Sequence, residues 1–224
     1  MRPPDYGRAF ELWRDSAPEW PAYTRHAFVE GLRRGDLPRA NFLHYLRQDY
    51  VFLIHFARAW ALAAAKADTL AEMQAASSTV DALVHQEMPL HVKSCAREGI
   101  DPAALEATME APANLAYTRY VLESGYSGDF LDLMAALAPC VLGYGEIGAR
   151  LSGAGGPYAE WIATYGGADY QALCQDVGAL IDGALAHRLG DDWHNLPRFA
   201  RLSDRFAMAT RLEVGFWDMG LAGA

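Results

Sequence analysis

The chain has 224 residues, of which 52% are hydrophobic and 21% are charged, and its formal net charge at pH 7 is −9. This length and balance are typical of one large globular domain, and the negative charge argues against binding to the phosphate backbone of nucleic acids. No window approaches the roughly 20 unbroken apolar residues that span a bilayer, and the first residues do not resemble a signal peptide.

Apolar residues recur at helical spacing along almost the whole chain, and no run alternates for long enough to predict a strand. Pro89 is expected to kink the fourth predicted helix. Short connections and the absence of a linker or repeat predict a single all-α domain over residues 1–224, built as a multi-helix bundle. In chain order, we expect helices near residues 5–16, 21–34, 39–66, 69–97, 102–109, 112–124, from the loop at 125–128 to 151, and near 157–165, 168–188 and 196–219.

Two features bear on the environment of the protein. The stretch from Leu53 to Ala65 carries almost no charge apart from Arg58, so this helix is expected to be central or to face a partner subunit. The cysteines, Cys95 among them, are three in number and widely spaced. They indicate free thiols in a reducing compartment, so we expect a cytoplasmic protein.

The segment 138–146, APCVLGYGE, is the first that could carry chemistry. Pro139 cannot donate a backbone hydrogen bond, so the helix is expected to bend beside Cys140. Tyr144 follows one turn later on the same face, and two glycines would allow a ligand or a neighbouring helix to approach. From these residues alone, Cys140 is either a nucleophile oriented by a hydroxyl group or, more commonly, a small buried hydrophobe.

Two acidic residues lie among aromatic residues in predicted helices. A carboxylate in an aromatic cage, as at Asp49, suits a flat heterocycle that bears an amino group, although a solvated aspartate fits the spacing equally well. Glu213 precedes Phe216 and Trp217, where desolvation would raise its pKa and make it a usable general acid. The alternative for Glu213 is a salt bridge to Arg211 or Arg205.

Several histidines could act as ligands of a metal ion or of haem. Glu87 and His91 lie one turn apart, as in carboxylate-bridged di-iron sites, but the next pair, Asp182 and His187, has unsuitable spacing. This favours a polar surface or a subunit contact over a metal. His26 could be read as a haem ligand, although a lone histidine is more often structural. Without a phosphate-binding glycine loop or a close cysteine pair, we expect no metal and no cofactor.

Five segments together resemble the TenA/thiaminase II family, cysteine-containing class, which has a haem-oxygenase-like helical fold. They cover nearly the whole chain in the family's order, and each is weak alone. Ala27 stands where the family has proline, Phe52 where some members have tyrosine, and glycines follow the cysteine where many members have aromatic residues. The segments are HAFVEGLRRGDLPRANFLHYLRQDYVFLIHFAR, AYTRYVLESGY, LAPCVLGYGEIGARL, YAEWIATYGG and EVGFWDM.

The resemblance implies roles for the residues that match the family's motifs. The implied catalytic residues are Cys140 as nucleophile, Tyr144 as its hydrogen-bonding neighbour, Asp49 at the ring nitrogen and amino group of a pyrimidine, and Glu213 as acid/base toward the leaving group. The implied substrate-binding residues are Asp49, Phe52, Tyr117, Tyr144 and Tyr165.

The activity implied is hydrolysis of aminomethyl-aminopyrimidine to hydroxymethylpyrimidine, and of thiamine to hydroxymethylpyrimidine and thiazole, for thiamine salvage. The implied partner is thus a small molecule, with no nucleic acid or membrane, and the implied assembly is a homotetramer. Two alternatives stay open: a di-iron or cofactor-dependent oxidase of the same fold that uses Glu87 and His91, and a non-catalytic pyrimidine-binding or regulatory protein.

Overall fold

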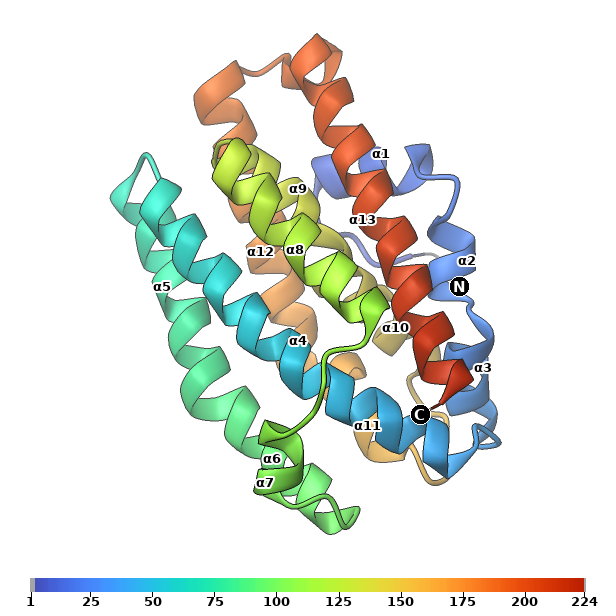
Figure 1. The fold of residues 1–224 in the computed structure, drawn as a ribbon. Helices are drawn as coiled ribbons and strands as arrows, with labels where there is room; N and C mark the ends of the chain where they lie inside the picture. Colours follow the sequence, from blue (N-terminus) through green and yellow to red (C-terminus); the bar gives the residue numbers. More distant parts are fainter. Residues whose placement is uncertain (1–2, 224) are drawn as a thin grey trace. The chain divides into compact units, whose positions relative to one another are not determined.

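The computed structural model describes residues 3–223, and every regular element among them is a helix (Figure 1). This confirms the all-α class predicted from the sequence. The described chain forms two compact units. The first comprises the residues up to Leu37 together with Met134–Trp217, and the second comprises Pro38–Leu133 and the residues from Asp218 onward. The single domain expected over residues 1–224 stays a prediction.

Most helices belong to one of the two units. The first holds α1 (Arg8–Ser16), α2 (Trp20–Thr24), α3 (Ala27–Arg34), the π-helix η2 (Pro139–Gly143), α10 (Tyr144–Leu151), α11 (Ala159–Gly166), α12 (Ala168–Leu189) and the 3-10 helix η3 (Trp193–Asn195). The second holds α4 (Arg39–Lys66), α5 (Leu70–Ala82), the π-helix η1 (Leu83–Glu87), α6 (Met88–Arg97), α7 (Pro102–Glu106) and α8 (Pro112–Ser127). Helices α9 (Phe130–Ala138) and α13 (Pro197–Ala222) contribute residues to both.

Most predicted helices are confirmed, and the differences have local causes. The helix predicted at 21–34 is two helices, because His26 is the N-cap of α3 and its side chain accepts a hydrogen bond from the Phe28 amide at 3.2 Å. His26 is therefore a structural cap, as a lone histidine usually is. Helix α8 continues to Ser127, through the loop predicted at 125–128.

Both prolines expected to bend helices lie at π-helices. In the segment predicted as one kinked helix, η1 ends two residues before Pro89, and the Met88 amide bonds back to the Leu83 carbonyl, the five-residue spacing of a π-turn. Pro139 is the first residue of η2. Each π-turn inserts a residue into the helical repeat and re-aims the side chains that follow, an arrangement frequent at functional sites.

The core of the first unit is rich in stacked aromatic rings. Phe206 of α13 stacks on Trp13 at a centroid distance of 5.5 Å and on Trp20 at 5.4 Å. The amino end of α1 is attached to α12, because the Asp182 carboxylate accepts hydrogen bonds from two successive α1 amides, each at 2.8 Å. This contact caps α1 and satisfies amides that have no partner within the helix.

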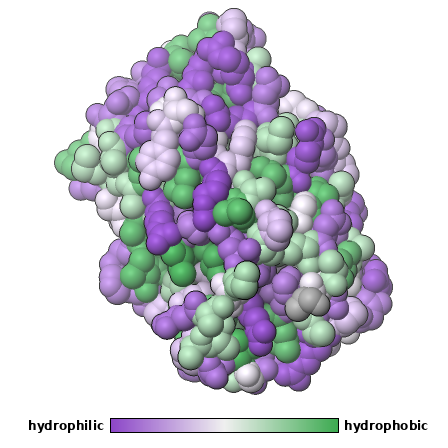
Figure 2. All heavy atoms as spheres, viewed as in Figure 1, coloured by the Kyte–Doolittle hydropathy of each residue, from purple (hydrophilic) through white to green (hydrophobic). Residues whose placement is uncertain are grey.

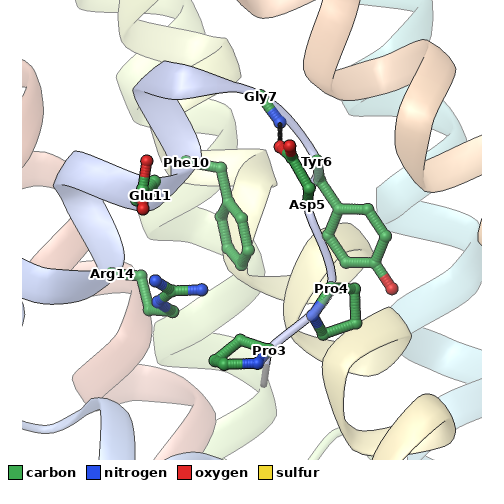
Figure 3. A pocket seen from close by; sticks show the side chains of 8 residues that line it. All are labelled: Pro3, Pro4, Asp5, Tyr6, Gly7, Phe10, Glu11 and Arg14. Atoms are coloured by element: carbon green, nitrogen blue, oxygen red, sulfur yellow. Dashed lines mark hydrogen bonds between the residues drawn. The ribbon is translucent and has the colours of Figure 1, made fainter.

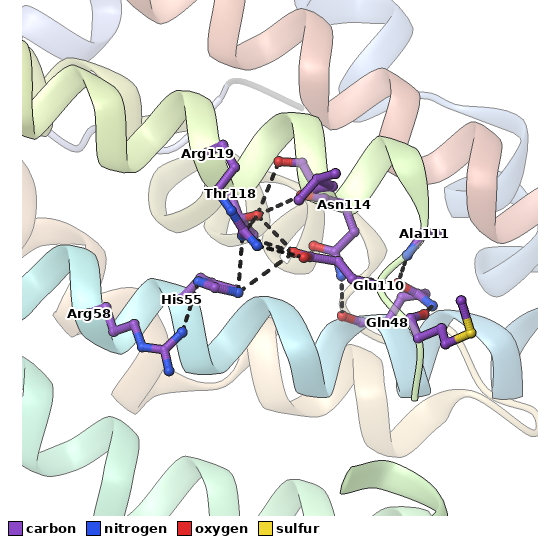
Figure 4. Close-up of polar contacts among 10 residues, drawn as sticks. Gln48, His55, Arg58, Glu110, Ala111, Asn114, Thr118 and Arg119 are labelled. Atoms are coloured by element: carbon purple, nitrogen blue, oxygen red, sulfur yellow. Dashed lines mark hydrogen bonds and ion pairs between the residues drawn. The ribbon is translucent and has the colours of Figure 1, made fainter. Parts of the chain in front are cut away.

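Helix α4 is the central element of the second unit and packs against α5, α6 and α8. A polar network joins it to α8 and to the loop before it (Figure 4). The Gln48 side chain donates to the Met109 carbonyl at 2.9 Å and accepts from the Ala111 amide at 3.0 Å. Asn114 donates to the Gln48 carbonyl at 2.8 Å. The buried Gln48 thus supplies partners to loop backbone that would otherwise be unpaired.

Among the described residues, one segment, Phe130–Leu151, is long and apolar enough to cross a membrane, and 94% of its most apolar window is buried in the protein. The sequence did not predict a membrane span here. The burial of the segment identifies it as part of the protein core. On the face drawn in Figure 2, hydrophobic residues are interspersed with hydrophilic ones.

Candidate functional site

Cys140 lies in η2, and other elements of the first unit hold the carbonyl groups of this π-helix. The thiol is buried and donates to the Leu137 carbonyl at 3.0 Å, which gives Sγ a defined direction. The Tyr23 hydroxyl donates to the Pro139 carbonyl at 3.0 Å, and the Tyr170 hydroxyl donates to the Val141 carbonyl at 3.3 Å. Side chains from α2 and α12 therefore donate hydrogen bonds to carbonyl groups of η2.

The two glycines beside Cys140 admit neighbouring side chains, as the sequence predicted for a close approach. A Cβ atom on Gly143 would lie 2.8 Å from the Tyr23 hydroxyl oxygen. A Cβ atom on Gly145 would lie 2.5 Å from Cys174 Sγ and 2.8 Å from the Tyr6 hydroxyl oxygen. Both positions require glycine because side chains of α2, α12 and the N-terminal segment occupy the space.

Tyr144 and Tyr165, predicted to belong to one pocket, are brought together within an aromatic cluster of the first unit. Their ring centroids are 5.0 Å apart, and the Tyr144 ring also lies 5.4 Å from that of Trp217 and 6.1 Å from that of Trp161. The Gln171 amide donates to the Tyr165 carbonyl at 2.9 Å. These two tryptophans belong to the cluster around Tyr144, and sequence reasoning did not single them out, although both lie within the quoted family segments.

Glu213 is buried in α13, with 1% of its surface exposed. One of its two proposed salt-bridge partners is occupied elsewhere, since Arg211 forms an ion pair with Glu19 at 2.6 Å. Trp217 lies one helical turn later on the same helix, so Glu213 is flanked by the aromatic residue that also contacts Tyr144. The burial of this carboxyl group suits an acid/base role, which stays a prediction.

The second unit contains the other predicted site residues. The rings of Phe52 on α4 and Tyr117 on α8 lie 5.3 Å apart, as expected for two members of one aromatic wall. Asn114 lies about one turn before Tyr117 and is bonded to Gln48, the residue that directly precedes Asp49. The network of Figure 4 thus fixes the register of the two helices that carry these side chains.

Asp49 is buried, with 5% of its surface exposed, so the solvated alternative is wrong. Burial raises the pKa of its carboxyl group to about 7, and a hydrogen bond from Tyr45 lowers it in part. The nearest basic group is His91, whose Nδ1 lies 3.6 Å from Asp49 Oδ2. A buried carboxyl group that titrates near neutral pH can hold or release a proton under physiological conditions, which suits recognition of a basic heterocycle.

Replacing Asp49 with asparagine is expected to stabilise the protein most at alkaline pH. The carboxyl group titrates near 3.8 ordinarily and near 7 in the fold, so its contribution to stability is full below about pH 4 and is lost as the pH rises through 7. The free energy of unfolding of Asp49→Asn, relative to wild type, should therefore increase between pH 4 and pH 8, on the order of a few kcal/mol. Urea unfolding at both pH values measures this, with exposed Asp81→Asn as control. An equal difference at both pH values would contradict it.

The polar surface that the sequence favoured for Glu87 and His91 does not describe His91, while a subunit contact at this pair stays a prediction. The His91 side chain is 10% exposed and lies beside Asp49, and burial, together with the charge of Asp49, raises the pKa of Glu87 to about 7. His85, by contrast, is on the surface and contacts Asp81 at 2.9 Å. Across residues 3–223, no group of three or more histidine, cysteine, aspartate or glutamate side chains is arranged to hold a metal ion.

A surface hollow on the first unit lies against the segment that leads into α1 (Figure 3). It contains none of the predicted site residues. Within it, the Asp5 carboxylate accepts a hydrogen bond from the Gly7 amide at 3.1 Å, and so caps the turn rather than facing a ligand. The residues that line it are Pro3, Pro4, Asp5, Tyr6, Gly7, Phe10, Glu11 and Arg14.

Comparison with known proteins places the chain in a family. Residues 13–223 match the TENA/THI-4/PQQC family. An uncharacterized protein of Haemophilus influenzae is 38% identical, over 94% of this chain and 97% of the relative. An aminopyrimidine aminohydrolase of Halalkalibacterium halodurans is 35% identical, over 94% of each chain. The crystal structure of a TenA family transcription regulator from a Silicibacter species is 62% identical, over 96% of this chain and 97% of that one, with a TM-score of 0.95. The chain therefore belongs to the TENA/THI-4/PQQC family and has its all-helical fold.

Proposed function

We propose that the protein is an aminopyrimidine aminohydrolase of thiamine salvage. It converts aminomethyl-aminopyrimidine to hydroxymethylpyrimidine and ammonia, and thiamine to hydroxymethylpyrimidine and thiazole. The observation that carries this proposal is the near full-length similarity to a relative with that name, in a chain that has a buried, oriented thiol at Cys140.

The proposed reaction is an addition followed by an elimination. The Cys140 thiolate adds to the ring carbon next to the one that bears the methylene group, and Asp49 passes a proton to the ring nitrogen. The leaving group then departs from the exocyclic methylene: an amine takes a proton from Glu213, whereas the thiazole of thiamine leaves as a neutral ring and needs none. Water adds at that methylene and gives a proton to the Glu213 carboxylate or to solvent, and loss of the thiolate together with return of the ring proton to Asp49 regenerates the pyrimidine and the enzyme. Covalent catalysis of this kind divides one difficult displacement into two easier steps.

The aromatic residues account for binding. The pair Phe52 and Tyr117 and the pair Tyr144 and Tyr165 each offer ring faces and hydroxyl groups suited to a flat, amino-substituted heterocycle. Tyr144 is also proposed to orient the thiol of Cys140. A tetrameric assembly is proposed from the resemblance, and a cytoplasmic location from the free thiols of the three cysteines.

A regulatory role is the second candidate, because the Silicibacter relative is described as a transcription regulator. The net charge of −9 disfavours direct contact with a nucleic-acid backbone. A thiol that is buried, oriented and set in a π-helix is not needed for binding alone, which favours the hydrolase.

Turnover by the wild-type protein tests the proposal. We expect hydroxymethylpyrimidine from both substrates, with the amine leaving after it takes a proton from Glu213 and the thiazole leaving as a neutral ring. Chromatography of reaction mixtures over time measures both rates. Tight binding of aminopyrimidines without any product would support the regulatory candidate instead.

A further inference from the structure

Asp49, Glu87 and His91 form a buried cluster in the second unit, of which the proposed reaction uses Asp49 alone. The side chains of Asp49 and His91 are 8% and 10% exposed, and Asp49 Oδ2 lies 3.6 Å from His91 Nδ1. The π-helix η1 ends at Glu87, and the regular turn that follows sets Glu87 and His91 on one face of the helix.

The hydrogen bond on the far side of His91 determines which nitrogen faces Asp49. His91 Nε2 lies 2.9 Å from the Leu46 carbonyl oxygen, and because a carbonyl only accepts, Nε2 carries a proton. In the neutral imidazole, Nδ1 then has a lone pair directed toward Asp49. A lone pair and an ionised carboxylate repel each other, so the Asp49–His91 pair is stable when it holds one proton, on either Oδ2 or Nδ1.

The other groups that face this pair set the side on which the proton lies. Burial lowers the pKa of His91, and the hydrogen bond to the Leu46 carbonyl and the charge of Glu87 offset this in part. Tyr45, on the same helix as Asp49, donates a hydrogen bond to it. Burial, and after it the charge of Asp49, raises the pKa of the Cys95 thiol of α6 to about 12, so Cys95 stays neutral. Glu87 is therefore a second carboxyl group beside His91, and its charge favours the proton on His91 over the proton on Asp49.

We propose that His91 is a positioning residue that stores the proton of Asp49, with Glu87 setting the balance between them. This inference rests on the proposed function and extends it to the path of the proton. Before the addition, the shared proton lies on His91 Nδ1. When the Cys140 sulfur adds to the ring, the Nδ1–H bond breaks as the Asp49 O–H bond forms, and this O–H bond breaks in turn as the ring N–H bond forms. The reverse transfers follow when the sulfur leaves, so no proton is gained or lost over the cycle.

The test compares His91→Gln with His85→Gln. The glutamine amide at position 91 can still donate to the Leu46 carbonyl, but it has no group that titrates toward Asp49. We expect kcat/KM for aminomethyl-aminopyrimidine to fall by about 10²-fold, mainly through kcat, and the alkaline limb of its pH profile to move to lower pH, because Asp49 then holds the proton without His91. His85 is 70% exposed on the same segment, so His85→Gln should match wild type in rate and in pH profile.

A second variant and a second measurement keep the test decisive. Glu87→Gln removes the charge that favours protonated His91, so its alkaline limb should persist but move to lower pH, which also tests the cluster if His91→Gln fails to fold. Calorimetry of hydroxymethylpyrimidine binding in buffers of different ionisation enthalpy should show altered proton uptake in both variants. Wild-type turnover with unchanged profiles and proton uptake in both variants would overturn this inference alone. A wild type without binding or turnover would overturn the proposed function as well.

Discussion

Replacing Cys140 with alanine is expected to abolish turnover of aminomethyl-aminopyrimidine and thiamine, with a loss on the order of 10³-fold or more, because no other group can form the sulfur–carbon bond. Binding of hydroxymethylpyrimidine should change little, since the aromatic side chains and Asp49 remain. The thiol is small and buried, and alanine leaves only a minor cavity. Steady-state kinetics and calorimetric binding on the same preparations measure the two effects.

The control for this prediction is Cys174→Ser. Cys174 is equally buried in the same unit and lies 3.6 Å from the Val141 carbonyl, to which a serine hydroxyl can also donate. This variant should retain most of the activity. If Cys140→Ala retains activity, Cys140 is not the nucleophile. Equal losses of activity in both variants would indicate that the packing of η2, rather than the thiol of Cys140, limits the rate.

Replacing Gly178 with alanine is expected to have the largest effect on stability. A Cβ atom on Gly178 of α12 would overlap the carbonyl oxygen of Tyr6 and lie 2.6 Å from its carbonyl carbon. The Tyr6 backbone cannot move away easily, because its ring is buried and its hydroxyl donates to Gln171 at 2.5 Å. The free energy of unfolding should fall by roughly 2–4 kcal/mol.

Gly183 lies on the same helix and provides a matched comparison. A Cβ atom there meets no atom within 4 Å, so Gly183→Ala should stabilise the protein by about 0.5–1 kcal/mol through higher helix propensity. Urea unfolding measures both variants, and unchanged m-values would show that the difference is one of stability. A Gly178→Ala variant as stable as Gly183→Ala would show that the N-terminal segment does not pack on α12 as described.

The helices could be predicted well where local signals agree. Helix α4 has the predicted limits because Pro38 precedes it and a long apolar repeat follows. The prolines at 89 and 139 marked the irregular positions, but not the π-turns themselves. In η2, the carbonyls are held by hydroxyl groups of Tyr23 and Tyr170, residues distant in sequence. A pattern within one helix contains no information about such partners.

The candidate site was predicted unevenly for a similar reason. The aromatic neighbours of Asp49 suggested a cage, but its burial depends on α6, about 40 residues later, and could not be decided from α4. The sequence identifies Glu87 and His91 as a pair one turn apart and favours a polar surface or a subunit contact for it. It contains no sign that the turn after η1 places His91 beside Asp49.

The most direct test of the central claim is the identity of the products formed by the wild-type protein. Aminomethyl-aminopyrimidine is incubated with protein treated with a metal chelator, in water enriched in heavy oxygen, and the products are identified by mass spectrometry. A hydrolase that uses its own thiol should release one ammonia for each hydroxymethylpyrimidine, with the heavy oxygen on the new hydroxyl group. Binding without product, or product formation only after iron and oxygen are added, would contradict the account.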